Sequence, residues 1–242
     1  MHTLIDFHSH ILPGIDDGSK SLEESIAMLK MEARQGIKKV VLSPHFYPHR
    51  DSPERFLHRR EIAEARLKEG MRNLKGLPEL EVGAEVHFFN GISDSQYLDS
   101  LTIKGKRCIL LEMQQPIWSE SVYREMSSIF YDRGIIPIIA HVDRYISRFR
   151  TYGIPERLAD LPVLVQANAS FFLQPGTKGM AMKMLREGKI QLLGSDCHNM
   201  TSRRPNLDLA LESIRQRFGD EMIKYINSYE RYALGEHSEK SL

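Results

Sequence analysis

The sequence predicts an α/β fold, a distorted seven-stranded (β/α)7 barrel of the TIM-like kind. Short apolar runs, of the type found in strands that are buried on both faces, recur along the chain. Several helical segments between these runs end at a glycine, which readily adopts the left-handed backbone that closes a helix. Histidines or acidic residues follow most of the runs, at the position where barrel enzymes carry their chemistry.

The predicted strands are seven runs, at residues 3–7, 39–43, 79–84, 108–111, 135–140, 162–167 and 191–195. Strands that alternate with helices are joined by right-handed crossovers, and this arrangement gives a parallel sheet. Seven such units favour closure of the sheet into a barrel. An open, doubly wound sheet is the alternative, because the number of strands does not by itself enforce closure.

The predicted helices occupy residues 22–35, 122–133, a segment that ends near Gly188, residues 207–218 and residues 221–229. Ser21 and Glu24 have the spacing of a capping box at the start of the first of these helices. A further helix begins near Ser52 and carries four arginines: Arg55, Arg59, Arg60 and Arg66. We interpret this basic run as a solvated helix face, and a contact with a phosphopeptide is the alternative.

The bulk composition favours one domain over residues 1–242, with a frayed tail from about residue 235. Lys and Arg number 33 against 32 for Asp and Glu, so no general basic field indicates nucleic-acid binding. No apolar run has the length of a membrane span and no signal region opens the chain. Two cysteines are too few for a disulfide framework, and we therefore expect a cytoplasmic protein.

Nine residues near the predicted strand ends are candidate metal ligands: His8, His10, Asp17, His45, Glu85, Glu112, His141, Asp196 and His198. Each alone has an ordinary explanation, such as a turn at Asp16-Asp17-Gly18 or a buried histidine that bonds to a neighbour. Together they converge at one end of the predicted barrel, and they are numerous enough for two or three ions. Nitrogen and oxygen ligands suit manganese, iron or zinc without choosing between them.

These residues, in this order, resemble the polymerase-and-histidinol-phosphatase (PHP) superfamily, and all of them except Glu112 lie in five segments that carry the likeness. The segments read IDFHSHILPGIDDGS over 5–19, SPH over 43–45, GAEV over 83–86, AHVDRY over 140–145 and GSDCHN over 194–199. Within the superfamily they look like the bacterial tyrosine-protein phosphatases of capsular and exopolysaccharide synthesis. The resemblance spans nearly the whole chain and implies a distorted barrel with a trinuclear metal site.

The resemblance also implies a role for each ligand. One ion would be held by His8, His10, Glu112 and Asp196, a second by Glu85, Glu112 and His141, and a third by Asp17, His45 and His198. Glu112 would then bridge two ions, for which manganese is the expected metal. Arg144 and Arg203 would bind the phosphate, with Arg204 as the alternative to Arg203.

The implied activity is hydrolysis of phosphotyrosine by a metal-bound hydroxide, with a bacterial tyrosine kinase as the substrate and partner. Homo-oligomers are implied by the family alone. Two other functions stay open: a phosphatase or phosphodiesterase for small molecules such as histidinol phosphate, and a silent metal-binding scaffold. Substrate choice is expected to depend on residues 48–53 and 114–120 and on exposed aromatic residues near the site.

A thiol mechanism is a further alternative, because Cys197 and Arg203 have the Cys-x5-Arg spacing of thiol-dependent tyrosine phosphatases. We interpret this spacing as accidental, because two candidate metal ligands occupy the same segment: His198 lies within it and Asp196 directly precedes it.

Overall fold

The computed structural model describes residues 4–114, 118–146 and 151–236 of the 242-residue chain. Its strands are β1 (Leu4–Ser9), β2 (Ile37–Leu42), β3 (His45–Phe46), β4 (Glu79–Val82), β5 (Glu85–His87), β6 (Cys108–Glu112), β7 (Ile136–Ile139), β8 (Leu164–Asn168) and β9 (Leu192–Gly194). The helices before β8 are α1 (Leu22–Arg34), α2 (Pro53–Met71), the 3-10 helix η1 (Ile92–Asp94), α3 (Leu98–Leu101), α4 (Glu120–Tyr131), α5 (Val142–Tyr145) and α6 (Ile154–Ala159). After β8 come α7 (Ala169–Leu173), α8 (Lys178–Arg186), α9 (Leu207–Phe218) and α10 (Asp220–Ala233).

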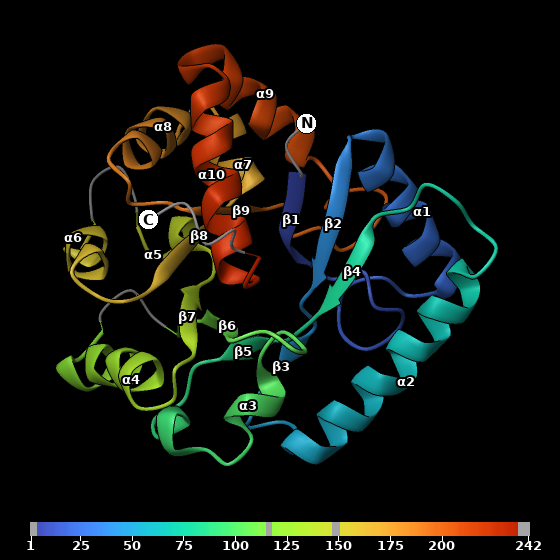
Figure 1. Cartoon of the computed structure of the whole chain (residues 1–242), viewed down its shortest axis with the longest axis horizontal. Coiled ribbons are helices and arrows are strands. Elements are labelled where there is room, and N and C mark those ends of the chain that lie inside the picture. The colour runs from blue at the N-terminus through green and yellow to red at the C-terminus, as the bar shows by residue number, and fades with distance from the viewer. Residues whose placement is uncertain (1–3, 115–117, 147–150, 237–242) are drawn as a thin grey trace.

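All paired strands are parallel, and they form two sheets with the orders β1-β2-β4 and β3-β5-β6-β7-β8-β9. The strands surround the middle of the molecule and the helices lie outside them (Figure 1). β1 and β9 also approach each other at their ends, where Ser9 and Cys197 form an isolated parallel bridge. The α/β class and the parallel sheet, predicted from the alternation of strands and helices, are confirmed.

The predicted count of seven strands is not confirmed, because the described residues form nine strands in sheets of three and six. Each predicted strand overlaps an observed strand, and the two additional strands, β3 and β5, follow the predicted runs at residues 39–43 and 79–84. β2 is separated from β3 at Pro44, which has no backbone N–H to donate. β4 is separated from β5 at Gly83, whose N–H donates to the carbonyl of Leu42 at 2.9 Å.

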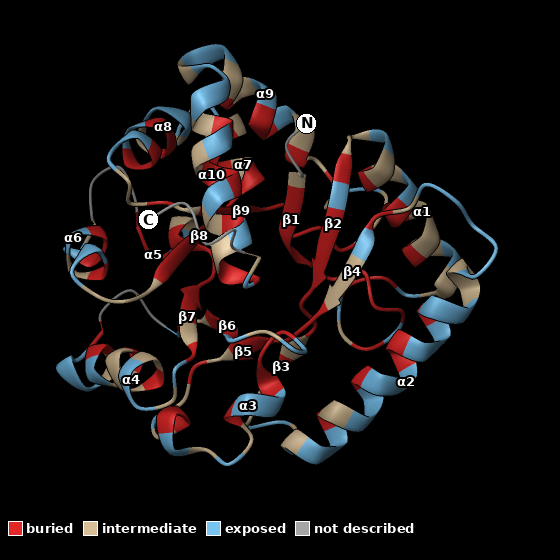
Figure 2. Ribbon diagram, in the orientation of Figure 1, coloured by how far each residue is buried: buried red, intermediate tan, exposed pale blue. Residues whose placement is uncertain are grey.

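The core lies inside the ring of strands and between the strands and the outer helices. Figure 2 shows most strand residues as buried, while the outer faces of the helices are exposed. β9 approaches β1 closely at Gly194, where a Cβ atom would lie only 2.5 Å from the Cβ of His8. Any larger residue at this position would push β9 away from the strand that carries the first two predicted ligands.

The helices largely follow the sequence. α1 begins after Ser21, whose side chain accepts a hydrogen bond from the N–H of Glu24 at 3.2 Å. The predicted helix at residues 207–218 coincides with α9. The interpretation of the arginines of α2 as a solvated face is wrong for Arg60, which is buried and donates to the carbonyls of Gly83 and Ser100. Its guanidinium carbon also lies 5.7 Å from the centre of the Phe56 ring, and the two hydrogen bonds to carbonyls outside the helix join α2 to the barrel.

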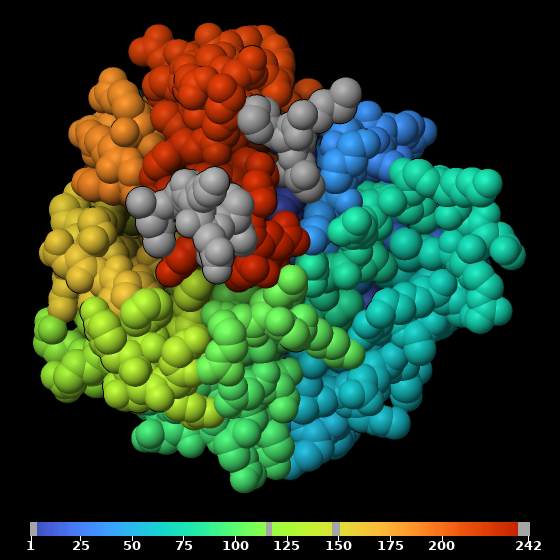
Figure 3. All heavy atoms as spheres, in the orientation of Figure 1, coloured from blue at the N-terminus to red at the C-terminus, as the bar shows by residue number. Residues whose placement is uncertain are grey.

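No helix in the described ranges is long and apolar enough to cross a membrane. Most of the tail predicted from residue 235 lies outside the described residues, which end at Glu236. α10 packs against β1 and β9, and the C-terminal helices cover part of the face seen in Figure 3.

A buried carboxyl group on α10 makes stability depend on pH. Burial raises the pKa of Glu230 to about 8, although Asn227 donates a hydrogen bond to the carboxylate. A raised folded-state pKa contributes stability that is complete below the unfolded value near 4.3 and is lost as pH rises to about 8. The free energy of unfolding of Glu230→Gln, measured in urea and relative to that of the parent, should therefore rise by roughly 1–4 kcal/mol from pH 5 to pH 8. An equal difference at both pH values would contradict this.

Candidate metal centre

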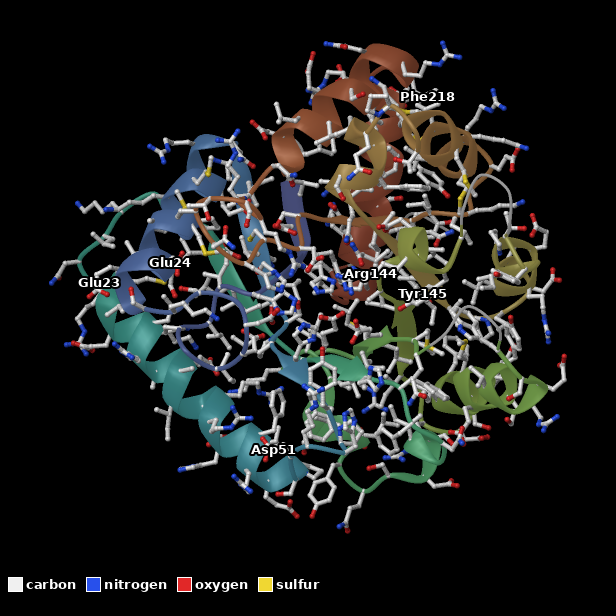
Figure 4. All side chains as sticks on the ribbon, turned by 180° about the vertical axis from the view of Figure 1, so that it is seen from behind. Glu23, Glu24, Asp51, Arg144, Tyr145 and Phe218 are labelled. Atoms are coloured by element: carbon white, nitrogen blue, oxygen red, sulfur yellow. The ribbon has the colours of Figure 1, made fainter. Side chains whose placement is uncertain are left out.

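The ligand atoms of all nine predicted residues fall into overlapping groups of near neighbours. His8 belongs to β1, His45 and Glu85 begin β3 and β5, Glu112 ends β6, and His141 follows β7 after Ala140. The others are in the segments that follow β1 and β9: His10, Asp17, Asp196 and His198. Figure 4, seen from behind, shows Arg144 near the middle of the ring, where these segments meet. The sequence therefore predicted that ligands far apart along the chain, such as His8 and His198, converge.

Glu85 lies at the centre of the histidines and is fully buried. Its Oε2 atom lies 3.2 Å from Nε2 of His8, 3.2 Å from Nε2 of His10 and 3.0 Å from Nδ1 of His45. Its Oε1 atom lies 2.6 Å from Nε2 of His141. Burial disfavours the carboxylate, but His8 and His141 hold the pKa of Glu85 well below its usual range. This carboxylate is therefore ionised and available to cations.

Asp196 forms a second centre, with one carboxylate oxygen directed at the histidines and the other at the rim. Its Oδ1 atom lies 3.5 Å from Nε2 of His10 and 3.8 Å from Nε2 of His8. Its Oδ2 atom accepts hydrogen bonds from Arg144 at 3.0 Å and Arg203 at 2.7 Å. Burial again opposes ionisation, yet contacts with His10 and His8 keep the pKa of Asp196 well below its usual range.

Asp17 joins His45 and His198 in a third group at the exposed edge. Its Oδ1 atom lies 3.5 Å from Nε2 of each histidine, and its side chain is 62% exposed. Ligand atoms of His10 also lie within 4.8 Å of these three residues. The sequence reasoning preferred a plain turn for Asp17 taken alone, and the structure brings it to the cluster.

Glu112 is placed differently from the arrangement implied by the resemblance. Its ligand atom groups with those of His45 and Glu85, whereas the group of His8, His10 and Asp196 does not include it. Its two carboxylate oxygens are contacted by Nδ1 of His87 at 3.3 Å and by Nη1 of Arg144 at 2.9 Å. In this structure Glu85, and not Glu112, contacts four of the predicted histidine ligands.

The site suits divalent cations. Within the described part of the chain, three of its buried polar atoms have no hydrogen-bond partner: Oδ1 of Asp196, Nε2 of His198 and Nδ1 of His45. Buried polar atoms are normally satisfied, so unpartnered atoms that point into one cluster indicate a ligand. Imidazole nitrogens and carboxylate oxygens are the donor set of zinc, iron and manganese sites.

Three residues that the sequence analysis did not assign orient these groups. Asp16 accepts from Nδ1 of His10 at 2.8 Å, which directs the opposite nitrogen of the ring toward Glu85. The side-chain oxygen of Asn168 lies 2.9 Å from Nδ1 of His141. The side-chain amide oxygen of Gln166 accepts a hydrogen bond from the backbone N–H of His141 at 2.9 Å. Gln166 was recognisable as a polar residue inside an apolar strand, but Asp16 looked like a turn residue.

Two site residues have backbone conformations that side chains rarely adopt. His141 and Asp196 have φ angles of 52° and 53°, and the only other described non-glycine residue with a positive φ is Tyr152. Such conformations cost about 1–3 kcal/mol each and persist where the surroundings require them. The strain at these two positions places an imidazole and a carboxylate at the cluster.

The arginines lie at the rim. The side chains of Arg144 and Arg203 are 41% and 39% exposed, and both guanidinium groups reach Asp196. Arg204, the alternative position, is exposed and its guanidinium has no ion pair among the described residues. The structure thus places Arg203, and not its neighbour, beside the cluster.

The aromatic residues near the site divide into two kinds. The ring of Tyr47 stacks on His45 with centroids 4.9 Å apart, and it is only half-buried. Phe46 is buried against Phe56, and Trp118 packs on Tyr145, so both are part of the packing. Residues 115–117 of the predicted substrate loop lie outside the described residues.

The thiol of Cys197 belongs to a separate group of buried side chains, with Asp6 and Glu32. It is fully buried, and its Sγ atom lies 3.9 Å from Oε1 of Glu32. Burial raises the pKa of Cys197 well above its usual range, and Glu32 raises it further. A protonated, inaccessible thiol is a poor nucleophile.

We therefore expect Cys197→Ser to hydrolyse phosphate esters within about threefold of the parent rate, because the thiol does not reach the substrate. The measurement is turnover of an aryl phosphate by both proteins, before and after treatment with a strong chelator. Loss of turnover in the variant, together with turnover that survives the chelator in the parent, would restore the thiol mechanism.

Comparison with known proteins agrees with this geometry. The family model of capsular polysaccharide synthesis, CpsB/CapC, matches residues 4–232. The tyrosine-protein phosphatase CpsB of Streptococcus pneumoniae is 30% identical over 236 residues, which cover 91% of this chain and 93% of the relative. The tyrosine-protein phosphatase YwqE of Bacillus subtilis is 27% identical over 234 residues, 90% of this chain and 87% of the relative.

Solved structures show the same fold. A chain from the crystal structures of YwqE from Bacillus subtilis and CpsB from Streptococcus pneumoniae, described as metal-dependent tyrosine phosphatases, matches with a TM-score of 0.84 at 21% identity. The match covers 97% of this chain and 96% of that one. The histidinol phosphate phosphatase of Lactococcus lactis matches less well, with a TM-score of 0.55 at 15% identity, over 93% of this chain and 94% of that one.

The predicted resemblance and the predicted phosphatase class are confirmed by these relatives. The family model covers nearly all of the described chain, and the cluster at the strand ends lies within the matched residues. The chain therefore belongs to the CpsB/CapC family of capsular polysaccharide synthesis proteins.

Proposed function

We propose that this protein is a metal-dependent protein-tyrosine phosphatase that hydrolyses phosphotyrosine at the cluster around Glu85. The observation that supports this best is the convergence of five histidines and four carboxylates with two rim arginines. Such a site can hold cations and bind a phosphoryl dianion in one place. The named activity of the relatives supports the choice of phosphotyrosine.

The proposed metal centre holds three divalent ions, with manganese as the expected metal and iron or zinc as alternatives. The ligand atoms form four overlapping groups: His8, His10 and Asp196; His8, Glu85 and His141; His10, Asp17, His45 and His198; and His45, Glu85 and Glu112. This grouping favours Glu85 as the bridging carboxylate, with Glu112 at its side. When bound, such ions polarise phosphoryl oxygens and lower the pKa of water at the site.

The side chains of this protein supply binding and orientation. The guanidinium groups of Arg144 and Arg203 can replace their hydrogen bonds to Asp196 with hydrogen bonds to phosphoryl oxygens. Charge-assisted contacts of this kind are stronger than neutral hydrogen bonds. The carboxylate of Asp16 and the amide of Asn168 hold two imidazole rings in fixed orientations. The half-buried ring of Tyr47 offers a face for the aromatic ring of the substrate.

The same proposal includes features that go beyond the family. We interpret the nine strands as seven positions of a distorted barrel, with β2/β3 and β4/β5 each counted once and the Ser9–Cys197 bridge closing the ring. A single domain, a cytoplasmic location and homo-oligomers stay predictions. The proposed substrate is a bacterial tyrosine kinase of capsular or exopolysaccharide synthesis, which the matched family supports.

The test is a comparison of substrates on the metal-loaded protein. We expect a phosphotyrosine peptide to be turned over faster than histidinol phosphate, while a bis-ester is the poorest substrate. Faster turnover of histidinol phosphate would indicate the small-molecule phosphatase instead. Full metal content without hydrolysis of any of the three would indicate a binding scaffold.

A further inference from the structure

A cavity of about 590 Å³ opens beside the cluster, between the loop after β3 and the first turns of α2. Asp17 and His45 line one side, and Arg50, Arg55 and Arg59 are also among its lining residues. We call it the arginine cavity. Figure 4 shows Asp51, another lining residue, beside the beginning of α2 and away from Arg144. The cavity is therefore continuous with the third ligand group.

The acidic residues of the cavity are already engaged. Asp51 is paired with Arg59 and lies 3.5 Å from Nε of Arg55, and its side chain is only 13% exposed. Asp16 accepts a hydrogen bond from Nδ1 of His10 at 2.8 Å. Asp17 faces His45 and His198. None of these carboxylates is left to neutralise a further positive charge among the arginines of the cavity.

Two arginines of the cavity are available to bind an anionic ligand. The guanidinium group of Arg50 lies 5.2 Å from the centre of the Tyr47 ring and has no ion pair among the described residues. The side chain of Arg55 is 79% exposed, and its only ion pair within the described part of the chain is the 3.5 Å contact with Asp51. Arg59 has a structural role, because it also donates to the carbonyl of Ile15 at 3.0 Å.

We propose that the arginine cavity binds an anionic side chain, a carboxylate or a phosphoryl group, that neighbours the phosphotyrosine in the substrate. This inference rests on the proposed function. Because Asp17 and His45 belong to both the cluster and the cavity, a peptide that is bound at the cluster extends into the cavity within a few residues. An extended peptide advances about 3.3 Å per residue, so an adjacent side chain reaches its wall. Arg50 and Arg55 then select substrates by charge.

The experiment compares the metal-loaded parent with the double variant Arg50→Ala/Arg55→Ala. The substrates are phosphotyrosine peptides with Ala, Glu or phosphoserine beside the phosphotyrosine, and 4-nitrophenyl phosphate. Arg66→Ala is the matched control, because Arg66 is an exposed arginine of α2 that does not line the cavity. Arg59 is kept, since its loss would free Asp51 and the loop at Ile15.

We expect the double variant to lose about tenfold in kcat/KM on the anionic peptides, mainly through KM. The Ala peptide, 4-nitrophenyl phosphate and the Arg66→Ala control should be unaffected. A larger loss on the Glu peptide identifies a carboxylate as the ligand, and a larger loss on the phosphoserine peptide identifies a phosphoryl group. Equal losses on all peptides, or no loss, would overturn the inference. Hydrolysis of the Ala peptide by the parent shows separately that the proposed function stands.

Discussion

Glu85→Gln is expected to lower phosphotyrosine hydrolysis by about a thousandfold or more and to reduce the number of bound cations. The variant keeps the size of the side chain but removes the charge that faces His8, His10, His45 and His141. Without this carboxylate, the four imidazoles remain as ligands. Much less negative charge is then left at the site to balance the positive charge of the cations. The measurements are steady-state kinetics and elemental analysis of the purified protein.

Glu112→Gln is the matched control for this change. Glu112 is a glutamate of the same cluster, but it contacts Arg144 and His87 at its edge. We expect a smaller loss of cations than in Glu85→Gln. Full cation content in Glu85→Gln with a large loss in Glu112→Gln would restore Glu112 as the bridging ligand.

Arg144→Ala and Arg203→Ala are each expected to lower kcat about a hundredfold, without a change in cation content. Each guanidinium stands within hydrogen-bond distance of the rim oxygen of Asp196, where the phosphoryl oxygens are expected to bind. Charge builds on those oxygens as the ester bond breaks, so the loss should fall on kcat more than on KM. Steady-state kinetics with an aryl phosphate separates the two parameters.

Arg204→Ala serves as the control, because Arg204 is exposed beside Arg203. It should keep the parent rate. A loss in Arg204→Ala as large as that in Arg203→Ala would mean that the sequence alternative between them was resolved wrongly.

The parts of the fold that the sequence predicted are those determined by local chemistry. The glycine after α1 and the cap at Ser21 marked that helix, and the helix predicted at residues 207–218 coincides with α9. The exact division of the strands also depends on pairing across the sheet, because Gly83 donates to the carbonyl of Leu42 and Glu85 donates to the carbonyl of Pro44. Arg60 was misjudged for a similar reason, since its hydrogen bonds reach residues 23 and 40 positions away.

The site was predictable where ligands follow strands, because strand ends of a parallel barrel meet at one end. Its organisation was less predictable. The sequence identifies Glu85 and Glu112 equally as strand-end carboxylates, and only the fold shows which one reaches four histidines. The orienting role of Asp16 depends on the curvature of its loop, which brings its carboxylate to both His10 and the N–H of His45.

The most direct test of the metal centre is titration of manganese into protein that has been stripped by a chelator. Bound manganese and phosphotyrosine hydrolysis are measured on the same samples. We predict that the stripped protein is inactive, that three ions bind per chain, and that activity returns as they bind. Full hydrolysis by the stripped protein, or binding of manganese that persists when Glu85 and Asp196 are both replaced, would contradict a metal centre at this cluster.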